Sequence, residues 1–245
     1  MEFLGDTLLK LLSSIEVFVL NPGDTEEGLT DKRKVIINNA WLCEKAIELR
    51  IYEYILLKND GPTPPEALSY KKILKQDFNN HDVIPDHYQH IPDKTLADIL
   101  EALTGVYYLQ NGSLLEAAQR FLFMIGVLRL PRIYPRFIPE GPHSRSVLQS
   151  DADFNALEKL IGHRFENPSL LIQAFTHSSA TSNPSDFQLT RILNSNESPA
   201  HFSYDRLEFL GDAVIDFIVV DYIFRNYTHL DPGMKLLFIC LLIKF

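Results

Sequence analysis

Cysteine is scarce in this chain, which has two cysteines among its 245 residues. Cys43 and Cys240 lie far apart in the sequence and match no metal-ligand spacing. A disulfide-stapled scaffold and a cysteine-based zinc site are therefore both excluded. We expect two free thiols and a reducing compartment.

Basic residues are also in short supply. The chain has 23 lysines and arginines against 32 acidic residues, a formal net charge of −9. A nucleic-acid binder is usually basic, so this balance argues against one. A nuclease is a partial exception, because carboxylates that hold metal ions contribute negative charge of their own. Local basic patches, or other parts of a longer protein, would then supply the phosphate contacts.

Long apolar runs are missing as well. Residues 1–12 contain Glu2 and Asp6 and lack the basic start and clean apolar run of a secretory signal. The apolar run 236–245 is shorter than the roughly 20 residues that a membrane span needs. We expect neither a signal nor a membrane segment. A hydrophobic fraction of 46% is enough for the core of one large or two small domains.

A five-residue string occurs twice. EFLGD stands at residues 2–6 and again at 208–212, and hydrophobic residues follow both copies. A repeat at this distance indicates two related domains rather than a solenoid.

Helical periodicity dominates the sequence between the copies. The spacing of apolar residues predicts helix within 29–57, with Val35, Ile36, Leu42, Ala46, Leu49 and Ile55 on the apolar face. A second helix starts at Pro92-Asp93 and ends at Asn111-Gly112, with Leu96, Ile99, Leu100, Leu103 and Tyr107 on its apolar face. A capping box of Ser113 and Glu116 opens a third, which runs through Phe123. Residues 76–93 are polar and predict a loop.

Proline-rich sequence divides the chain. Four prolines between 129 and 150 rule out a regular helix there and favour an extended connection. We therefore predict a first domain at 1–128, a linker at 129–150 and a second domain at 151–245, of which 236–245 diverges. Helices resume at 151–161 and 169–175. Strand patterns are almost absent, so the fold class is predicted to be all-α.

Paired carboxylates are the candidates for chemistry. Glu2 and Asp6 are four residues apart, and Asp98 and Glu101 are three apart, so each pair shares a helix face. Two such helices side by side would present four carboxylates to one point, the oxygen environment that magnesium prefers. Two close cations could then activate water and stabilise the leaving oxygen in phosphodiester hydrolysis.

The alternative for any acidic pair is a solvated helix face. Against it, these carboxylates sit inside the apolar strings EFLGD and LADILEAL, and the first string recurs with Glu208 and Asp212. Gly5 and Gly211 would leave room for close helix packing or metal approach. Asp205 and Asp216 extend the second acidic face, and a solvated helix edge is the equal alternative for them.

These strings resemble the ribonuclease III family. YDRLEFLGDAVIDF is similar to its ERLEFLGD signature, and KTLADILEALTG to its ADxxEAL helix. GLTDKRKVIINNAWLCEKA resembles the segment between those motifs, and FENPSLLIQAFTHSS the family's opening helices. Two copies in tandem resemble the nuclease region of Dicer-type enzymes, or of their nuclear Drosha-type relatives.

The resemblance implies an all-α, metal-dependent endoribonuclease acting on double-stranded RNA in RNA processing and small-RNA silencing. It implies an intramolecular pseudo-dimer of the two domains, and double-stranded-RNA-binding proteins as further partners. The implied cofactor is Mg²⁺, with Mn²⁺ as the alternative. The implied compartment is the cytoplasm, with the nucleus as the alternative.

Carried over by position, the resemblance implies a set of site residues. The metal ligands would be Glu2, Asp6, Asp98 and Glu101 in the first centre and Glu208 and Asp212 in the second. Asp6, Glu101 and Asp212 would be the catalytic members. Lys94 and Asp205 match positions linked to substrate or dimer contacts. For Lys94, an ordinary surface lysine is an equal alternative. His177 is expected to be a structural hydrogen-bonding residue rather than a base.

The sequence also departs from the family pattern. The first copy lacks the opening helices, and after residue 234 the second lacks the segment that leads to a second ADxxEAL motif. We therefore interpret both copies as incomplete, with a full set of carboxylates only in the first. Two alternatives stay open: a non-catalytic RNA-binding or scaffold module with a ribonuclease III fold, and an inactive fragment.

Overall fold

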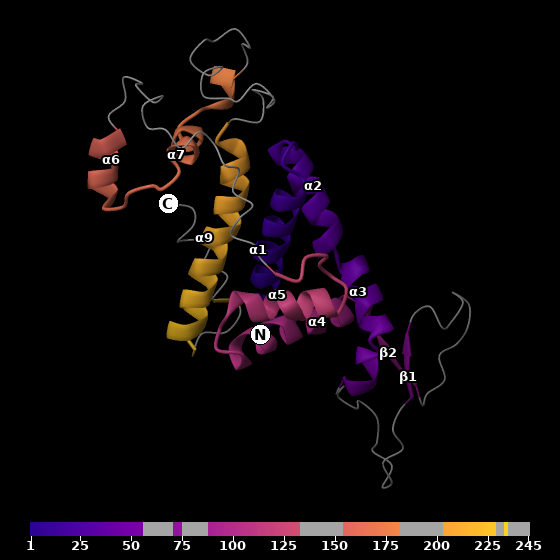
Figure 1. Cartoon of the computed structure of the whole chain (residues 1–245). Helices are drawn as coiled ribbons and strands as arrows, with labels where there is room; N and C mark the ends of the chain where they lie inside the picture. Colours follow the sequence, from indigo (N-terminus) through magenta and orange to yellow (C-terminus); the bar gives the residue numbers. More distant parts are fainter. Residues whose placement is uncertain (56–70, 75–87, 133–153, 182–202, 229–232, 235–245) are drawn as a thin grey trace. The chain divides into compact units, whose positions relative to one another are not determined.

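The computed structural model describes residues 1–55, 71–74, 88–132, 154–181, 203–228 and 233–234 (Figure 1). Helices account for most of these residues, as the sequence predicted. The chain divides into two compact units. Unit 1 comprises residues 1–16, 32–133 and 213–245, and unit 2 comprises residues 17–31 and 134–212.

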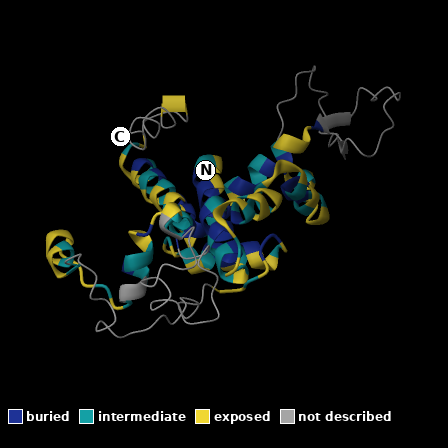
Figure 2. Cartoon of the chain, turned by 90° about the horizontal axis from the view of Figure 1, so that it is seen from above, coloured by how far each residue is buried: buried dark blue, intermediate teal, exposed yellow. Residues whose placement is uncertain are grey.

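Unit 1 is built around the first part of helix α1 (Glu2–Leu20). Its leucines pack into a core with helix α4 (Asp93–Gln110) and helix α5 (Leu115–Met124). The fully buried members include Leu4, Leu8 and Leu12 of α1 and Leu100 of α4. Figure 2 shows buried segments of the ribbon close to the N-terminus. The part of helix α9 (Asp205–Asn226) that belongs to unit 1 adds Val220 to the same core.

The region predicted as helix within 29–57 forms three pieces. They are α2 (Glu26–Ile37), α3 (Asn39–Glu48) and the 3-10 helix η1 (Ile51–Tyr54). Asn38 separates the first two because its backbone is extended and its side chain accepts a hydrogen bond from the Trp41 N–H at 2.7 Å. Leu42, Ala46 and Ile55 are buried as predicted, but the predictions for Val35 and Leu49 are wrong, since they are 66% and 42% exposed.

Two short strands correct the expectation of a purely helical chain. β1 (Lys71–Leu74) pairs in parallel with β2 (Tyr88–Ile91), with Lys71 opposite Tyr88 and Leu74 opposite Ile91. The predicted loop at 76–93 is therefore partly strand and ends in the first turn of α4. The sequence did not predict β2 because its four residues lie in a polar segment, and so short a run gives little periodic pattern. Ile91 is buried beside Cys43, Ala46 and Leu96 in a second small core.

Both ends of α4 lie where the sequence predicted. Pro92 is the extended residue before the helix, and Asn111 follows its last residue. Gly112 has a φ of 72°, a left-handed conformation that favours glycine. The capping box is wrong: Ser113 also has a positive φ, 59°, and Leu114 precedes α5 without a side-chain capping hydrogen bond.

Unit 2 contains the shorter helices α6 (Phe154–Ile161) and α7 (Pro168–Ala174) and the 3-10 helix η5 (Ser178–Thr181). It also holds the first turns of α9. Arg206 on α9 is buried and donates hydrogen bonds to the carbonyls of Phe18, Asn21 and Asp24. These carbonyls lie at and just beyond the C-terminal end of α1, where backbone acceptors have no helical partner.

Several expectations fall outside the described residues. Most of the predicted linker lies in 133–153, and the divergent tail lies in 235–245, so the domain boundaries stay a prediction. Cys240 is outside as well, whereas Cys43 is a buried free thiol, as expected. None of the helices in the part of the chain that the structure describes has the length and apolar character needed to cross a membrane.

Candidate metal centre

Two glycines bring α1 and α4 into close contact. A Cβ atom on Gly5 would lie 1.8 Å from the backbone oxygen of Glu101. A Cβ atom on Gly105 would lie 2.9 Å from the backbone oxygen of Met1. No larger residue fits at Gly5 without moving a helix. The glycine of the first EFLGD string thus lets the start of α1 lie against the acidic turn of α4.

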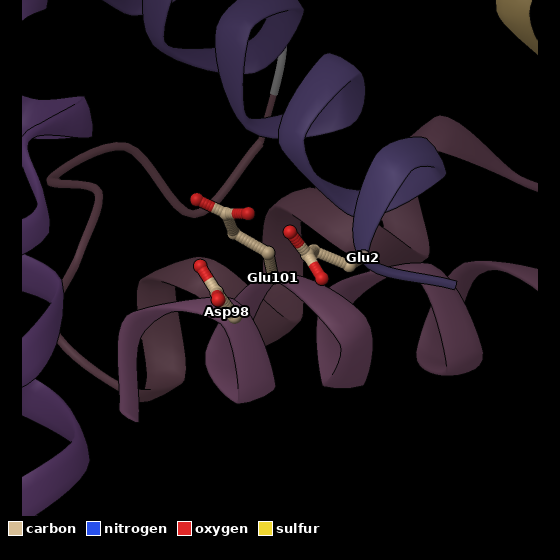
Figure 3. A group of neighbouring side chains, drawn as sticks. All are labelled: Glu2, Asp98 and Glu101. Atoms are coloured by element: carbon tan, nitrogen blue, oxygen red, sulfur yellow. The ribbon is translucent and has the colours of Figure 1, made fainter. Parts of the chain in front are cut away.

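This crossing gathers three carboxylates. Oxygen atoms of Glu2 from α1 and of Asp98 and Glu101 from α4 all lie within 4.8 Å of one another. Figure 3 shows the three side chains facing a common space between the two helices. Glu2 is exposed, Asp98 is half-buried and Glu101 is buried. They are a group of three through which one metal ion could be held, open to solvent on the side of Glu2.

Within the cluster, Glu101 has a strongly raised pKa. Burial, together with the charges of Asp6, Asp98 and Glu2, raises the pKa of the Glu101 carboxyl to about 8. Lys94 lowers it only partly. Carboxylates this close repel one another unless a proton or a cation is shared among them. The cluster therefore has the charge and the donor atoms that a divalent cation would neutralise.

Asp6 lies one turn beyond Glu2 on α1 but is not one of the three gathered carboxylates. Its charge is nevertheless the second largest cause of the raised pKa of Glu101. Partial desolvation raises the pKa of Asp6 itself, Lys10 opposes that shift, and Glu2 and Asp216 add to it. Asp6 thus belongs to the electrostatic surroundings of the cluster.

Lys94 lies one helical turn before Asp98 on α4. Its ammonium group donates to both carboxylate oxygens of Asp98, each at 2.7 Å. This bond is the main reason that the pKa of Lys94 is raised. A cation that took an oxygen of Asp98 as ligand would compete with Lys94 for it.

The second EFLGD copy lies on α9, where the described residues gather no comparable group. Glu208 and Asp212 are both exposed. Across the ranges that the structure describes, no second set of three metal-binding side chains converges. Asp205 is half-buried and accepts a hydrogen bond from the Ser203 hydroxyl at 2.9 Å.

Asp216 has a specific partner. It forms an ion pair with Lys10 of α1, which settles it as a contact residue rather than a solvated helix edge. Lys10 and Asp216 occupy equivalent positions in the two copies, each four residues beyond the Asp of EFLGD. The sequence reasoning missed Lys10, although opposite charges at equivalent repeat positions were a signal for it. Arg206, in the string YDRLEF, was also missed.

His177 takes part in a local turn. Its Nδ1 atom accepts the Ser179 N–H at 3.1 Å and lies 2.8 Å from the Ser179 hydroxyl. The ring is also 5.6 Å from that of Tyr204. These contacts are those of the structural residue that the sequence led us to expect.

Comparison with known families finds one match, in the first part of the chain. Residues 1–112 match the family model of the ribonuclease III domain. That range contains α1 and α4 and all three gathered carboxylates. This part of the chain is therefore similar to the ribonuclease III domain, as the motifs indicated.

Particular relatives are Dicer-like proteins. The chain is 31% identical over 233 residues to "Dicer-like protein 2" of Aspergillus oryzae, 30% over 243 residues to "Dicer-like protein 1" of Neurospora crassa, and 28% over 252 residues to "Endoribonuclease Dicer homolog 4" of Oryza sativa subsp. japonica. Each alignment covers 95% of this chain. The chain spans only 15%, 14% and 14% of those three proteins, respectively.

Proposed function

We propose that this chain is the nuclease region of a Dicer-like endoribonuclease, which hydrolyses phosphodiester bonds of double-stranded RNA with divalent metal ions. The observation that carries the proposal is the convergence of Glu2, Asp98 and Glu101 on one point. The ribonuclease III match over the same residues and the name of the rice relative, an endoribonuclease, support the reaction class.

In this proposal Glu2, Asp6, Asp98 and Glu101 hold Mg²⁺, or Mn²⁺ as the alternative. The cations supply the activation of water and the stabilisation of the leaving oxygen. The chain's own carboxylates provide the negative charge on two helix faces, which Gly5 allows to approach closely. Lys94 would release Asp98 when a cation binds and would then be available to a phosphate oxygen.

The second centre is proposed from the sequence repeat. Glu208 and Asp212 match the ligands of the first copy in sequence, and Asp205 precedes them at the position that the family links to dimer or RNA contacts. The ion pair between Lys10 and Asp216 supports an intramolecular pseudo-dimer of two copies, because it joins equivalent positions. The proposed domains remain 1–128 and 151–245, joined by the linker 129–150.

We also propose a cellular role, which is based on the Dicer-like relatives. A Dicer-like nuclease would act in small-RNA silencing and would work beside double-stranded-RNA-binding proteins. The cytoplasm is the proposed compartment, with the nucleus as the alternative. The competing function is a non-catalytic RNA-binding or scaffold fragment, which would keep the fold without cutting RNA.

The test is cleavage of a long RNA duplex in Mg²⁺ by the chain and by Glu101→Gln. We expect cutting by the parent chain and a loss of about 100-fold or more in the variant, because one carboxylate of the cluster is gone. Glu116→Gln on α5 is the matched control, since Glu116 is exposed and lies outside the cluster. A parent chain that binds duplex RNA but never cuts it, in Mg²⁺ or Mn²⁺, would support the scaffold alternative.

A further inference from the structure

Tyr108 lies on the buried face of helix α4 that also carries Glu101. The two residues are seven apart, so they lie about two turns apart on that face, and Tyr108 is only 3% exposed. The hydroxyl of a buried tyrosine needs a hydrogen-bonding partner. The partners of Tyr108 come from α9, in the part of that helix that belongs to unit 1.

Tyr108 and two charged residues of α9 form a closed hydrogen-bonded network. The Tyr108 hydroxyl donates to Oδ1 of Asp221 at 3.3 Å and accepts a hydrogen bond from Nη2 of Arg225 at 3.2 Å. Arg225 also donates from Nε to Oδ2 of Asp221 at 2.7 Å. Burial, together with the charge of Asp221, raises the pKa of Tyr108, so the hydroxyl keeps the proton that it donates. The ring of Phe217 meets the Tyr108 ring edge-on, with centroids 5.9 Å apart.

The charged pair on α9 has no equivalent at the same positions of α1. Asp221 and Arg225 are four residues apart on one face of α9. Because the two EFLGD strings lie 206 residues apart, these residues correspond to Ile15 and Val19, which are apolar. The pair is therefore a feature of the second copy at these positions, and it contacts the helix that carries two carboxylates of the first metal cluster.

Three contacts join α1, α4 and α9 into a closed frame within unit 1. The start of α1 crosses α4 at Gly5 and Gly105. Helix α9 contacts α1 through the ion pair of Asp216 with Lys10. It contacts α4 through the hydrogen bonds of Tyr108. Each of the three helices is thus held by the other two.

The orientation of α4 determines where its carboxylates lie. Asp98 and Glu101 project from α4 and Glu2 projects from α1, so a rotation of α4 about its axis would separate the oxygen atoms that now lie within 4.8 Å of one another (Figure 3). Apolar packing is non-directional, whereas hydrogen bonds require a particular geometry. The network at Tyr108 acts on the same face of α4 as Glu101 and therefore restricts this rotation.

We propose that Asp221 and Arg225 are positioning residues for the metal cluster and act through the hydroxyl of Tyr108. They are not metal ligands, since Tyr108 itself lies about 10 Å along the helix from Glu101. Their effect is on geometry, and a metal site loses affinity when its ligands are held loosely. The inference rests on the proposed function in one respect, that the cluster binds a divalent cation.

The test is Tyr108→Phe in the full chain, which removes one hydroxyl and keeps the ring. Calorimetric titration with Mn²⁺ at pH 7, without RNA, should show binding at least about fivefold weaker than that of the parent. Asp221→Asn should have a similar effect, and the double variant should lose no more than either single variant, because both remove the same contact. Tyr107→Phe is the matched control: this neighbouring phenol stacks on Phe121 instead, and its loss should leave the affinity unchanged.

Urea unfolding of the same variants separates positioning from stability. A Tyr108→Phe chain that is less stable but binds Mn²⁺ as tightly as the parent would overturn the proposal, since the network would then only stabilise the fold. Strictly additive losses of Mn²⁺ affinity in the double variant would overturn it as well. Absence of Mn²⁺ binding in the parent chain would overturn the proposed function and this inference with it, whereas parent binding that Tyr108→Phe leaves unchanged would overturn the inference alone.

Discussion

Glu101 is the residue on which the chemistry of the first cluster depends. It is buried, it faces Glu2 and Asp98, and its pKa lies near 8 because burial and neighbouring charge favour the protonated form. An acid in this state costs the folded protein stability whenever it ionises. The same repulsion favours a divalent cation, which removes the cost without a proton.

The metal-free chain should lose stability as the pH rises. The folded pKa of Glu101 is about 8 and the ordinary value is 4.5, so the folded state binds the proton more tightly. Its contribution is fully present below about pH 4.5 and is lost between pH 4.5 and 8. At pH 8 without metal, Glu101→Gln should be more stable than the parent by on the order of 2 kcal/mol.

Urea unfolding at pH 5 and pH 8 in the presence of a chelator measures this difference. Glu116→Gln should follow the parent at both pH values, since Glu116 lies outside the cluster. A parent whose pH dependence equals that of Glu101→Gln would show that Glu101 ionises normally.

Lys94 competes with a cation for Asp98. Its ammonium group occupies both oxygens of that carboxylate, and its charge partly neutralises the cluster. Lys94→Gln should therefore tighten Mn²⁺ binding by about threefold, the modest effect expected of an exposed charge. It should slow cleavage if Lys94 then serves the phosphate. Weaker Mn²⁺ binding in this variant would contradict the account, and calorimetric titration decides between the two.

At the scale of the helices, one glycine decides whether the cluster exists. Gly5 allows α1 to contact the backbone of Glu101, which places Glu2 beside Asp98. The sequence predicted close helix packing or metal approach at both Gly5 and Gly211, and within the described residues only Gly5 has a close helix neighbour. Identical EFLGD strings could not reveal this difference, because it depends on which helix lies opposite.

Substitution of the two glycines should separate these roles. Gly5→Ala should destabilise the chain by about 3 kcal/mol or more, since its Cβ would overlap a backbone oxygen. Gly211→Ala should be neutral or stabilise by up to about 1 kcal/mol through helix propensity. Thermal or urea unfolding of both variants provides the comparison. Equal costs at the two sites would refute the close crossing of α1 and α4.

Helix boundaries that depend on local sequence signals were predictable, whereas features that depend on tertiary neighbours were not. Pro92 and Asn111 bound α4 as the sequence indicated, because their signals are local. The buried residues of α3 were partly predictable, whereas Val35 and Leu49 have helical spacing but are exposed, since spacing alone does not show which face a tertiary neighbour covers. The short parallel pair of β1 and β2 could not be predicted, since partners 17 residues apart leave no periodic pattern.

At the scale of the whole chain, equivalent positions of the two copies meet at one ion pair. Lys10 and Asp216 are both about a quarter exposed, so their attraction is only partly screened. The sequence predicted two copies by their motifs. The opposite charges of Lys10 and Asp216 at equivalent positions were a signal that the sequence reasoning missed, and the packing of α9 against the core of unit 1 is what brings the two residues together.

Exchange of the two charges tests this contact. Lys10→Asp and Asp216→Lys alone should each destabilise the chain by about 1 kcal/mol, because each places like charges together. The double variant should recover most of that loss in urea unfolding. Strictly additive losses would mean that the two side chains are not coupled in solution.

The central claim is that the carboxylates of α1 and α4 form a divalent cation site. Calorimetric titration of Mn²⁺ into the chain at pH 7, without RNA, tests it most directly. The account predicts saturable binding with release of a proton from Glu101, equal binding by Glu116→Gln, and at least about tenfold weaker binding by Glu101→Gln. Binding of equal strength in Glu101→Gln, or none in the parent chain, would contradict it.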